Sequence, residues 1–573
     1  MAKSVAVFGG GVAGLTVAHE LARTMGPAVE VTVYERNAAL GGKARSFRKP
    51  GSAAGKGHVD LPGEHGFRFF PGYYRHVIDT MRDIPYPAGG PGATAADNLV
   101  PAPETHFART SGPAIAMPNS FPTSLKETAE LFSFAGQVDI PMSDAMRFAK
   151  ALLMMSISSD KRRLKKYEGV SWFDFVGGDA GTDDYKKYLA DGLNQRTVAA
   201  SGKDVSARTV GVTLVRIMRD WLNPGTCIDR VLDGPTSERW IEPWRDRLKT
   251  LGVQLELESV LTELDWDAGG VNGATISTAK GPSTVTADAY VVATPLDDAR
   301  AVFSGSKMIG ANIGLDGLPD LSADWMNGIQ LYFEAPLDLA QGHVIYVDST
   351  LSLTSICQHL FWDGVDFSTL GDGTVKALLS VDISDWSKAR NMTRAQVQAE
   401  VLHQLQAHIV PSYFTPEGLK GPLPKLATWF LDPAIVEDPD PKAHPRLGDK
   451  EALFINRTGC WWKRPAATTD LSNLFVAADY VQTTTDLATM EGANEAGRRA
   501  ARGILQRFDH PHDGVQLFDF PEPLGFMHLR SQDADAWDNA DNEDAGEGDA
   551  DEPGGPVDLP DPAIPDAWEA IPG

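Results

Sequence analysis

The chain begins with an apolar segment, a glycine turn and an amphipathic pattern, in that order. Residues 4–8 predict a buried parallel strand, Gly9, Gly11 and Gly14 follow at the G-x-G-x-x-G spacing, and residues 12–21 have a helical pattern. These glycines permit a tight turn, close approach of the backbone to a pyrophosphate, and close helix–strand packing. The phosphates would lie at the helix N-terminus, where free N–H groups favour negative charge. The order predicts a dinucleotide site in an α/β fold.

A second predicted strand, residues 30–34, ends in Glu35. An acid about 20 residues past the glycines is placed to bind the ribose hydroxyls of an adenosine. An acid rather than an arginine at this point argues against a 2′-phosphate. Arg36 follows directly, and it leaves that inference open.

Composition excludes several classes of protein. The 573 residues carry a net charge of −25, which argues against nucleic-acid binding as the main function. Three well-separated cysteines, with no C-x-x-C, fit a reducing compartment and offer no cysteine-rich metal site. The sequence shows no signal peptide and no membrane-spanning segment, so we expect a cytoplasmic protein. We also expect no bound metal. The oligomeric state stays open.

Two further stretches each permit two interpretations. Gly41, Gly42, Lys43 and Arg45 could wrap a pyrophosphate, or they could form a surface turn with two solvated cations. Residues 63–74 (GEHGFRFFPGYY) hold five aromatic side chains and a histidine, which could line a flat aromatic cofactor or belong to the core.

Taken together, these motifs resemble the FAD-dependent amine oxidase and carotenoid desaturase superfamily. The segments VFGGGVAGL, VTVYER, LGGKARSF and GEHGFRFFPGYY occur in that family's order, and NLFVAADY with ATMEGANEAG is similar to its closing FAD motif. The closest likeness is to plant-type phytoene and zeta-carotene desaturases and their bacterial relatives. One departure is Ala478, where the family usually has glycine before the acid Asp479.

The resemblance implies which residues hold FAD. Asp479 follows a short apolar strand and would accept from a ribityl hydroxyl, the backbone at Val260 would meet the adenine, and Gly66 with Phe67 would face the flavin ring. The full set of expected FAD residues is Gly9, Gly11, Val12, Ala13, Gly14, Glu35, Arg36, Gly42, Lys43, Ala44, Arg45, Gly66, Phe67, Val260, Asp479 and Met490.

Other side chains are candidates for the chemistry itself. His65, Arg68 and Glu491 are candidates for proton handling or orientation, although no residue of the sequence must be a base. Trp461 and Trp462 could line the substrate cavity, and core packing is an equal alternative for them.

The expected architecture is α/β. A discontinuous, Rossmann-like and glutathione-reductase-like FAD domain would comprise residues 1–80, 233–305 and 455–510. Residues 81–232 would form a helical, substrate-binding or membrane-facing insertion, and 306–454 a mixed α+β substrate domain. A basic run at 161–166 beside an apolar helix could rest on a membrane surface, or it could be a solvated turn. Residues 531–573 are acidic and predict a disordered tail.

The resemblance implies a desaturase, dehydrogenase or redox-neutral isomerase acting on a lipophilic isoprenoid or carotenoid-like substrate. Hydride would pass to flavin N5, and a quinone or oxygen would then accept the electrons. An amine or amino-acid oxidase is the main alternative, because the scaffold is shared. A flavoprotein that serves only as a binding partner is a third.

Overall fold

The structure is a computed structural model that describes residues 2–121, 140–191, 201–223, 225–414, 422–440, 442–520 and 524–547. The chain divides into two compact units. Unit 1 comprises Met1–Asn119, Asp229–Ile455 and Trp462–Asp519, and unit 2 comprises Ser120–Ile228, Asn456–Trp461 and Phe520–Gly573. Among the residues described, no helix combines the length and the apolar character needed to cross a bilayer.

A five-stranded parallel sheet lies in unit 1, in the order β23-β13-β1-β2-β9. Its strands are β1 (Lys3–Phe8), β2 (Val29–Tyr34), β9 (Gln254–Glu256), β13 (Ala289–Val292) and β23 (Leu474–Val476). They come from three distant parts of the chain, and the central ones are almost wholly buried, as helices on both faces of a parallel sheet require. The predicted α/β class is confirmed.

Helices α1 (Val12–Met25) and α13 (Met490–Arg507) pack on each other beside this sheet. They approach closely, because a Cβ at Gly497 would lie 2.5 Å from the Ala13 carbonyl oxygen. The same unit contains α2 (His76–Arg82), α10 (Glu242–Thr250) and α11 (Leu296–Gly305). It also contains an antiparallel sheet of β10 (Val260–Asp267), β11 (Gly270–Thr278) and β12 (Gly281–Val285).

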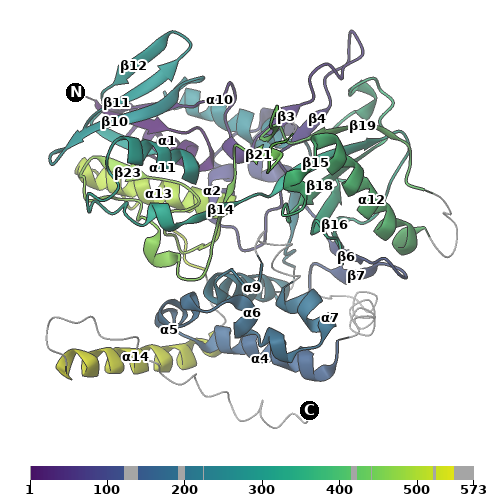
Figure 1. Ribbon diagram of the computed structural model, residues 1–573. Coiled ribbons are helices and arrows are strands. Elements are labelled where there is room, and N and C mark those ends of the chain that lie inside the picture. Colours follow the sequence, from purple (N-terminus) through teal and green to yellow (C-terminus); the bar gives the residue numbers. More distant parts are fainter. Residues whose placement is uncertain are drawn as a thin grey trace. The chain divides into compact units, whose positions relative to one another are not determined.

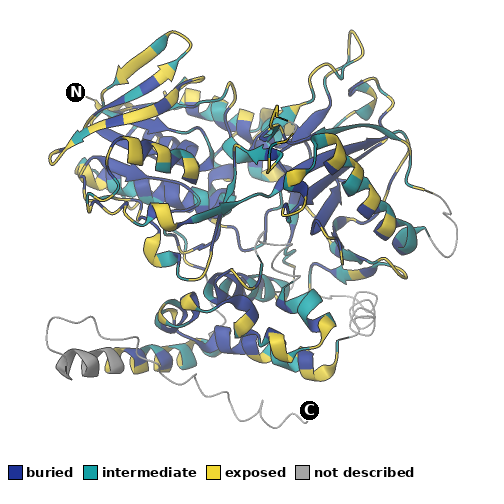
Figure 2. Ribbon diagram, viewed as in Figure 1, coloured by how far each residue is buried: buried dark blue, intermediate teal, exposed yellow. Residues whose placement is uncertain are grey.

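A seven-stranded mixed sheet forms the other half of unit 1, in the order β19-β15-β18-β17-β16-β6-β7. Its strands are β6 (Glu104–Ala108), β7 (Ile115–Pro118), β15 (Asn327–Phe333), β16 (Gly342–Tyr346), β17 (Leu353–Cys357), β18 (Ala377–Ile383) and β19 (Leu426–Leu431). One face is apolar and is covered by α12 (Arg394–Tyr413) (Figures 1 and 2). Because β6 and β7 belong to this sheet, the prediction of one helical insertion from residue 81 is wrong for residues 104–118.

The opposite face of the seven-stranded sheet carries both polar and apolar side chains, and most of them are buried. Cross-strand neighbours share a face, and Gln330, Ser380, Ile356 and His343 are paired in that order across β15, β18, β17 and β16. Short strand pairs complete unit 1: β3 (Ser46–Arg48) with β4 (Pro62–Glu64), β5 (Leu99–Pro101) with β8 (Arg230–Leu232), β14 (Ser322–Asp324) with β22 (Leu453–Ile455), and β20 (Ile435–Glu437) with β21 (Leu447–Asp449).

Unit 2 is helical in its described part. Its main helices are α4 (Met142–Ile157), α5 (Asp160–Lys165), α6 (Trp172–Phe175), α9 (Ala207–Trp221) and α14 (Met527–Glu547). Met155, Tyr167, Ala207 and Val215 form one buried cluster among these helices.

Helix α14 overturns part of the predicted disordered tail, since it includes residues 531–547. It packs on α4 and α5 (Figure 1). Trp537 is 1% exposed, and the Arg162 guanidinium lies 5.4 Å from its ring centre. The rest of the predicted tail, residues 548–573, lies outside the described residues.

The basic run 161–166 is therefore not simply a solvated turn, because its two arginines are buried. Arg162 and Arg163 are each 2% exposed. Arg162 forms an ion pair with Asp533 on α14, and Lys161 pairs with Asp538. The acidic segment neutralises the basic one, which sequence periodicity could not reveal.

Candidate functional site

The first glycine turn has no room for side chains. Gly9 has φ +119°, and a Cβ there would lie 2.3 Å from the Ala293 carbonyl oxygen. A Cβ on Gly14 would lie 1.9 Å from the Gly9 carbonyl oxygen. Gly11 precedes α1 and makes no side-chain cap, and the first turn of the helix has no acid. The N–H groups of this turn, which includes Val12 and Ala13, therefore face the place that a phosphate would take.

Glu35 lies at the end of β2 and is 4% exposed. One carboxylate oxygen accepts from the Gly10 N–H at 2.7 Å, and the other accepts from the Asn37 N–H at 2.8 Å. These bonds fix the carboxylate beside the glycine turn and leave lone pairs for ribose hydroxyls. Arg36, by contrast, is bound by Asp298 at 2.6 Å, so its charge is already balanced.

The second glycine turn packs directly on the first. The Gly41 N–H donates to the Gly10 carbonyl at 2.8 Å, and a Cβ on Gly42 would lie 3.0 Å from the Gly11 Cα. Residues Gly42–Ala44 form a short helical turn there, with Ala44 buried. This placement favours the phosphate-binding interpretation over a surface turn.

The two cations of this turn are bound by acids. The Lys43 ammonium lies 3.3 Å from a carboxylate oxygen of Asp479, which joins the N-terminal turn to the closing motif. Arg45 is buried, donates to the Gly42 carbonyl at 2.6 Å, and pairs with Glu451 at 2.8 Å. Glu451 was not predicted, because nothing near it in the sequence marks it as a partner of Arg45.

His65 is also paired with an acid that the sequence did not reveal. Its Nδ1 lies 2.5 Å from a carboxylate oxygen of Asp432, which also accepts from Asn327 at 2.8 Å. Burial opposes ionisation of Asp432, but the charge and hydrogen bond of His65 lower its pKa below the ordinary value. The contact with Asp432 fixes the position of the His65 side chain within the aromatic-rich segment 63–74.

Gly66 and Phe67 lie against the face of the seven-stranded sheet opposite α12. A Cβ on Gly66 would lie 2.5 Å from a carboxylate oxygen of Asp382, and the Phe67 N–H donates to the same oxygen at 3.2 Å. The Gly328 N–H donates to the His65 carbonyl at 2.5 Å. The loop is therefore bound to β15 and β18 through its backbone.

Two buried acids, Glu64 and Asp382, flank this loop. Burial raises the pKa of each to about 7, and the charge of Arg68 partly opposes that rise. Arg68 itself donates to the carbonyls of Gly66, at 2.8 Å, and Lys43. Sequence reasoning missed both acids as site residues, although an aspartate in the apolar strand ALLSVDI was a usable signal for Asp382.

Glu491 has a structural use. It is fully buried, and its carboxylate accepts from the N–H groups of Arg75, His76 and Val77 at 2.8–2.9 Å. His76 Nδ1 also lies 2.8 Å from it. The carboxylate thus caps the N-terminus of α2, and these contacts give no support to the hypothesis that it handles protons.

The remaining predicted residues lie as follows. Met490 is the first residue of α13. Val260 is 42% exposed at the start of β10. The N–H of the preceding residue, Ser259, donates to the Glu35 carbonyl at 2.9 Å. This hydrogen bond brings the segment beside the expected adenosine site. Trp461 lies 4.0 Å from the Arg208 guanidinium in unit 2, and Trp462 is 56% exposed.

Within the described part of the chain, no group of three or more His, Cys, Asp or Glu side chains is placed to hold a metal ion. The acids and histidines of the site instead form pairs with each other and with arginines.

This geometry defines a dinucleotide-binding protein of the α/β class. The chain belongs to the flavin containing amine oxidoreductases, whose family model matches residues 12–505. No curated protein matches. The cofactor is therefore FAD and the protein is an FAD-dependent oxidoreductase. The glycine turns, which a Cβ would fill, and the Glu35 carboxylate fit the pyrophosphate and ribose of that group.

Solved structures show the same fold at low identity. An oxidoreductase from Methanosarcina mazei is similar with 13% identity and a TM-score of 0.57, over 88% of this chain and 100% of that one. Cyclohexylamine oxidase from Brevibacterium oxydans IH-35A has 13% identity and a TM-score of 0.55, over 89% and 100%. A putrescine oxidase has 13% identity and a TM-score of 0.57, over 88% and 99%.

Proposed function

We propose that this enzyme is a dehydrogenase or desaturase for a lipophilic, isoprenoid or carotenoid-like substrate. The observation that carries the proposal is the apolar wall around the loop expected to face the flavin. Phe67 is buried in a cluster with Ile356, Phe361 and Trp362, and Phe69 packs at its edge. Such a wall suits a substrate with few polar groups.

The residues of the chain itself would hold the substrate in position and exclude water from it. The bound FAD supplies the oxidant for hydride removal. Gly66 and Phe67, fixed by Asp382, would set the distance between loop and ring. A redox-neutral isomerase is a variant of the same proposal.

An amino-acid oxidase receives less support. It needs a cation for the substrate carboxylate, but Lys43 pairs with Asp479, Arg45 pairs with Glu451, and Arg68 donates to backbone carbonyls. An amine oxidase stays the second candidate, because buried acids such as Glu64 and Asp382 suit an ammonium group. Trp461 and Trp462, which could have lined the substrate cavity, add no support to this candidate, since Trp462 is largely exposed.

Anaerobic bleaching of the flavin tests this proposal. The holoenzyme is mixed with polyenes and isoprenoid lipids in micelles and, separately, with amines and amino acids. We expect loss of the oxidised flavin band with a lipid only. Bleaching by an amine alone would refute the proposal. Product analysis with pre-reduced flavin then distinguishes the isomerase variant.

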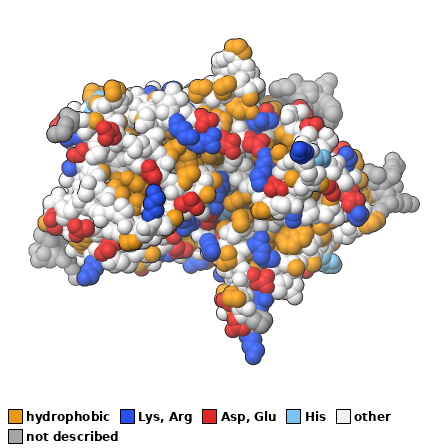
Figure 3. Space-filling model, turned by 90° about the horizontal axis from the view of Figure 1, so that it is seen from above, with side chains coloured by type: hydrophobic (Ala, Val, Ile, Leu, Met, Phe, Trp, Pro, Cys, Tyr) orange, Lys and Arg blue, Asp and Glu red, His pale blue; other side chains and the backbone are white. Residues whose placement is uncertain are grey.

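We also propose that a quinone or oxygen reoxidises the flavin and that unit 2 touches membranes peripherally. Met142 is 70% and Leu222 is 52% exposed in that unit, which supports an apolar contact. Figure 3, which views the molecule from above and not the face that carries Met142 and Leu222, shows acidic and basic side chains interspersed on the side that it draws. Flotation with neutral and anionic vesicles tests the contact, and equal recovery without vesicles would refute it.

A further inference from the structure

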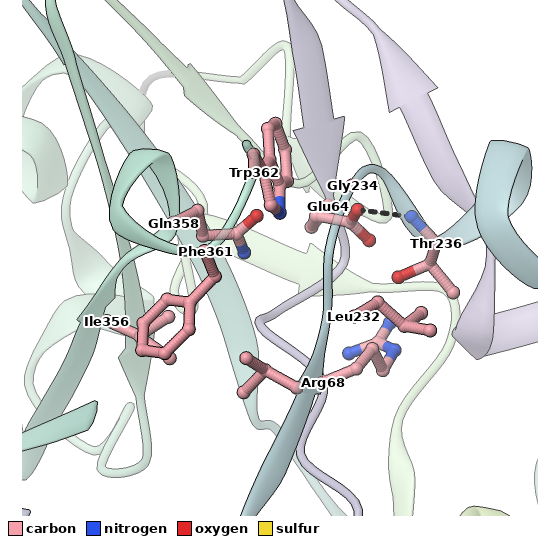
Figure 4. Close-up of a pocket in the computed structure, with 10 residues that line it drawn as sticks. Glu64, Arg68, Leu232, Gly234, Thr236, Ile356, Gln358, Phe361 and Trp362 are labelled. Atoms are coloured by element: carbon pink, nitrogen blue, oxygen red, sulfur yellow. Dashed lines mark hydrogen bonds between the residues drawn. The ribbon is translucent and has the colours of Figure 1, made fainter. Parts of the chain in front are cut away.

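A small cavity lies beside Glu64, within unit 1. Its volume is about 20 Å³, and its lining includes Glu64, Arg68, Thr236, Gln358 and Trp362 (Figure 4). A cavity needs roughly 10–15 Å³ to hold one water molecule. The space is therefore sized for one water and too small for an organic substrate.

One oxygen of Glu64 is available to such a water. The first oxygen accepts from the Thr236 N–H at 3.1 Å, the dashed contact in Figure 4. The second is buried and has no hydrogen-bond partner among the residues that the structure describes. Glu64 as a whole is 2% exposed, so an unpartnered oxygen there would be costly without a water.

The backbone of Glu64 is firmly placed. It ends β4, and its N–H donates to the Gln330 side-chain oxygen at 3.0 Å. The Tyr332 hydroxyl donates to the Pro62 carbonyl on the same strand. Hydrogen bonds therefore fix the backbone of β4 beside the cavity, and the change that remains for Glu64 is the protonation of its carboxyl group.

The cavity adjoins the loop that is expected to face the flavin. Gly66 and Phe67 follow Glu64 by two and three residues. Phe67 shares its buried cluster with Ile356, Phe361 and Trp362, which also line the cavity. The charged and titratable groups that interact with this acid are Arg68, which lines the cavity, the buried acid Asp382, Tyr332 on β15 and Arg48 on β3.

We propose that this cavity is an acid–base site: it holds one water, and the Glu64 carboxylate takes through that water the proton released in dehydrogenation. The inference rests on the proposed function. One substrate C–H bond would break with loss of hydride, for which FAD, when bound, would supply the two-electron acceptor. A neighbouring C–H bond breaks with loss of a proton, its electron pair forms the double bond, and an O–H bond forms on Glu64. The proton later passes to solvent.

Infrared difference titration of the holoenzyme tests the acid independently of any substrate. Because Glu64 and Asp382 both have a pKa of about 7, we expect the wild type to lose protonated-carboxyl intensity near neutral pH and E64Q to lack the part of that loss that Glu64 contributes. D144N is the matched control, because Asp144 is also buried, at 3% exposure, but hydrogen bonds from Thr182 lower its pKa. A loss of intensity near neutral pH that is as large in E64Q as in the wild type, or that is reduced in D144N, would overturn the proposal.

The rate of flavin reduction by the substrate tests the proton transfer. We expect the wild-type rate to rise with pH through neutrality, and E64Q to be slower by about 100-fold with that rise abolished. Gln358→Leu removes a polar wall of the cavity and retains the acid, so it should slow reduction and keep the pH midpoint. An unchanged pH profile in E64Q would overturn the role. If no lipid reduces the flavin, the proposed function fails while the infrared result still stands.

Discussion

The contact between α14 and α5 gives a quantitative prediction. Asp533 accepts from the Ser159 N–H at 2.8 Å and pairs with Arg162 at 2.8 Å, and both charged side chains are 2% exposed. Asp538 makes a similar pair with Lys161, but these side chains are 55% and 42% exposed. The two aspartates are therefore a matched pair that differs in burial.

Replacing Asp533 by asparagine leaves the Arg162 charge buried without its counter-charge. Breaking a buried pair costs about 3–5 kcal/mol, whereas an exposed pair contributes about 1 kcal/mol or less. Because asparagine retains part of the hydrogen bonding, we expect about 3 kcal/mol for D533N and under about 1 kcal/mol for D538N.

Hydrogen exchange of α14 measures this difference. An opening free energy lowered by 3 kcal/mol raises exchange by roughly 100-fold, since about 1.4 kcal/mol corresponds to a factor of ten. We expect that acceleration in residues 527–539 for D533N and less than about fivefold for D538N. Equal rates in the two variants, or no acceleration in D533N, would refute the burial argument.

Three further predictions concern unit 1. G14A should lose bound FAD and melt at lower temperature, because its Cβ would lie 1.9 Å from the Gly9 carbonyl oxygen. The control G305A, which has open space around the new Cβ, should retain FAD. Equal flavin content in the two variants would contradict this prediction. E35Q should weaken FAD binding about 10-fold or more, because it removes the charged acceptor for the ribose hydroxyls. Titration of the apoprotein with FAD measures this affinity, and an unchanged affinity would count against the ribose contact. Burial raises the pKa of Glu64 in the folded state from 4.5 to about 7, so between these pH values the folded state binds a proton that the unfolded state has lost. The free energy of unfolding should therefore fall by roughly 3 kcal/mol as the pH rises from 4.5 to 7. Denaturant titrations of E64Q should show a flatter decline, and a slope identical to wild type would contradict the assignment.

Local sequence determined the dinucleotide site because its requirements are local. Backbone approach and a positive φ at Gly9 allow few alternatives to glycine, and a strand that ends in Glu35 places the acid next to the same turn. The turn at Gly42 could be interpreted in two ways until its contact with Gly11 showed that the two turns pack together.

Tertiary structure alone decided which charges meet. Arg45 and Glu451, His65 and Asp432, and Arg162 and Asp533 are separated by hundreds of residues, so no spacing rule connects them. The acidic segment 531–573 is low in apolar residues and predicts disorder by composition. Its residues 531–547 nonetheless belong to α14, because Arg162 on α5 pairs with Asp533 and lies over the buried ring of Trp537. Burial also determined that Glu64 and Asp382, ordinary acids in sequence, titrate near neutral pH.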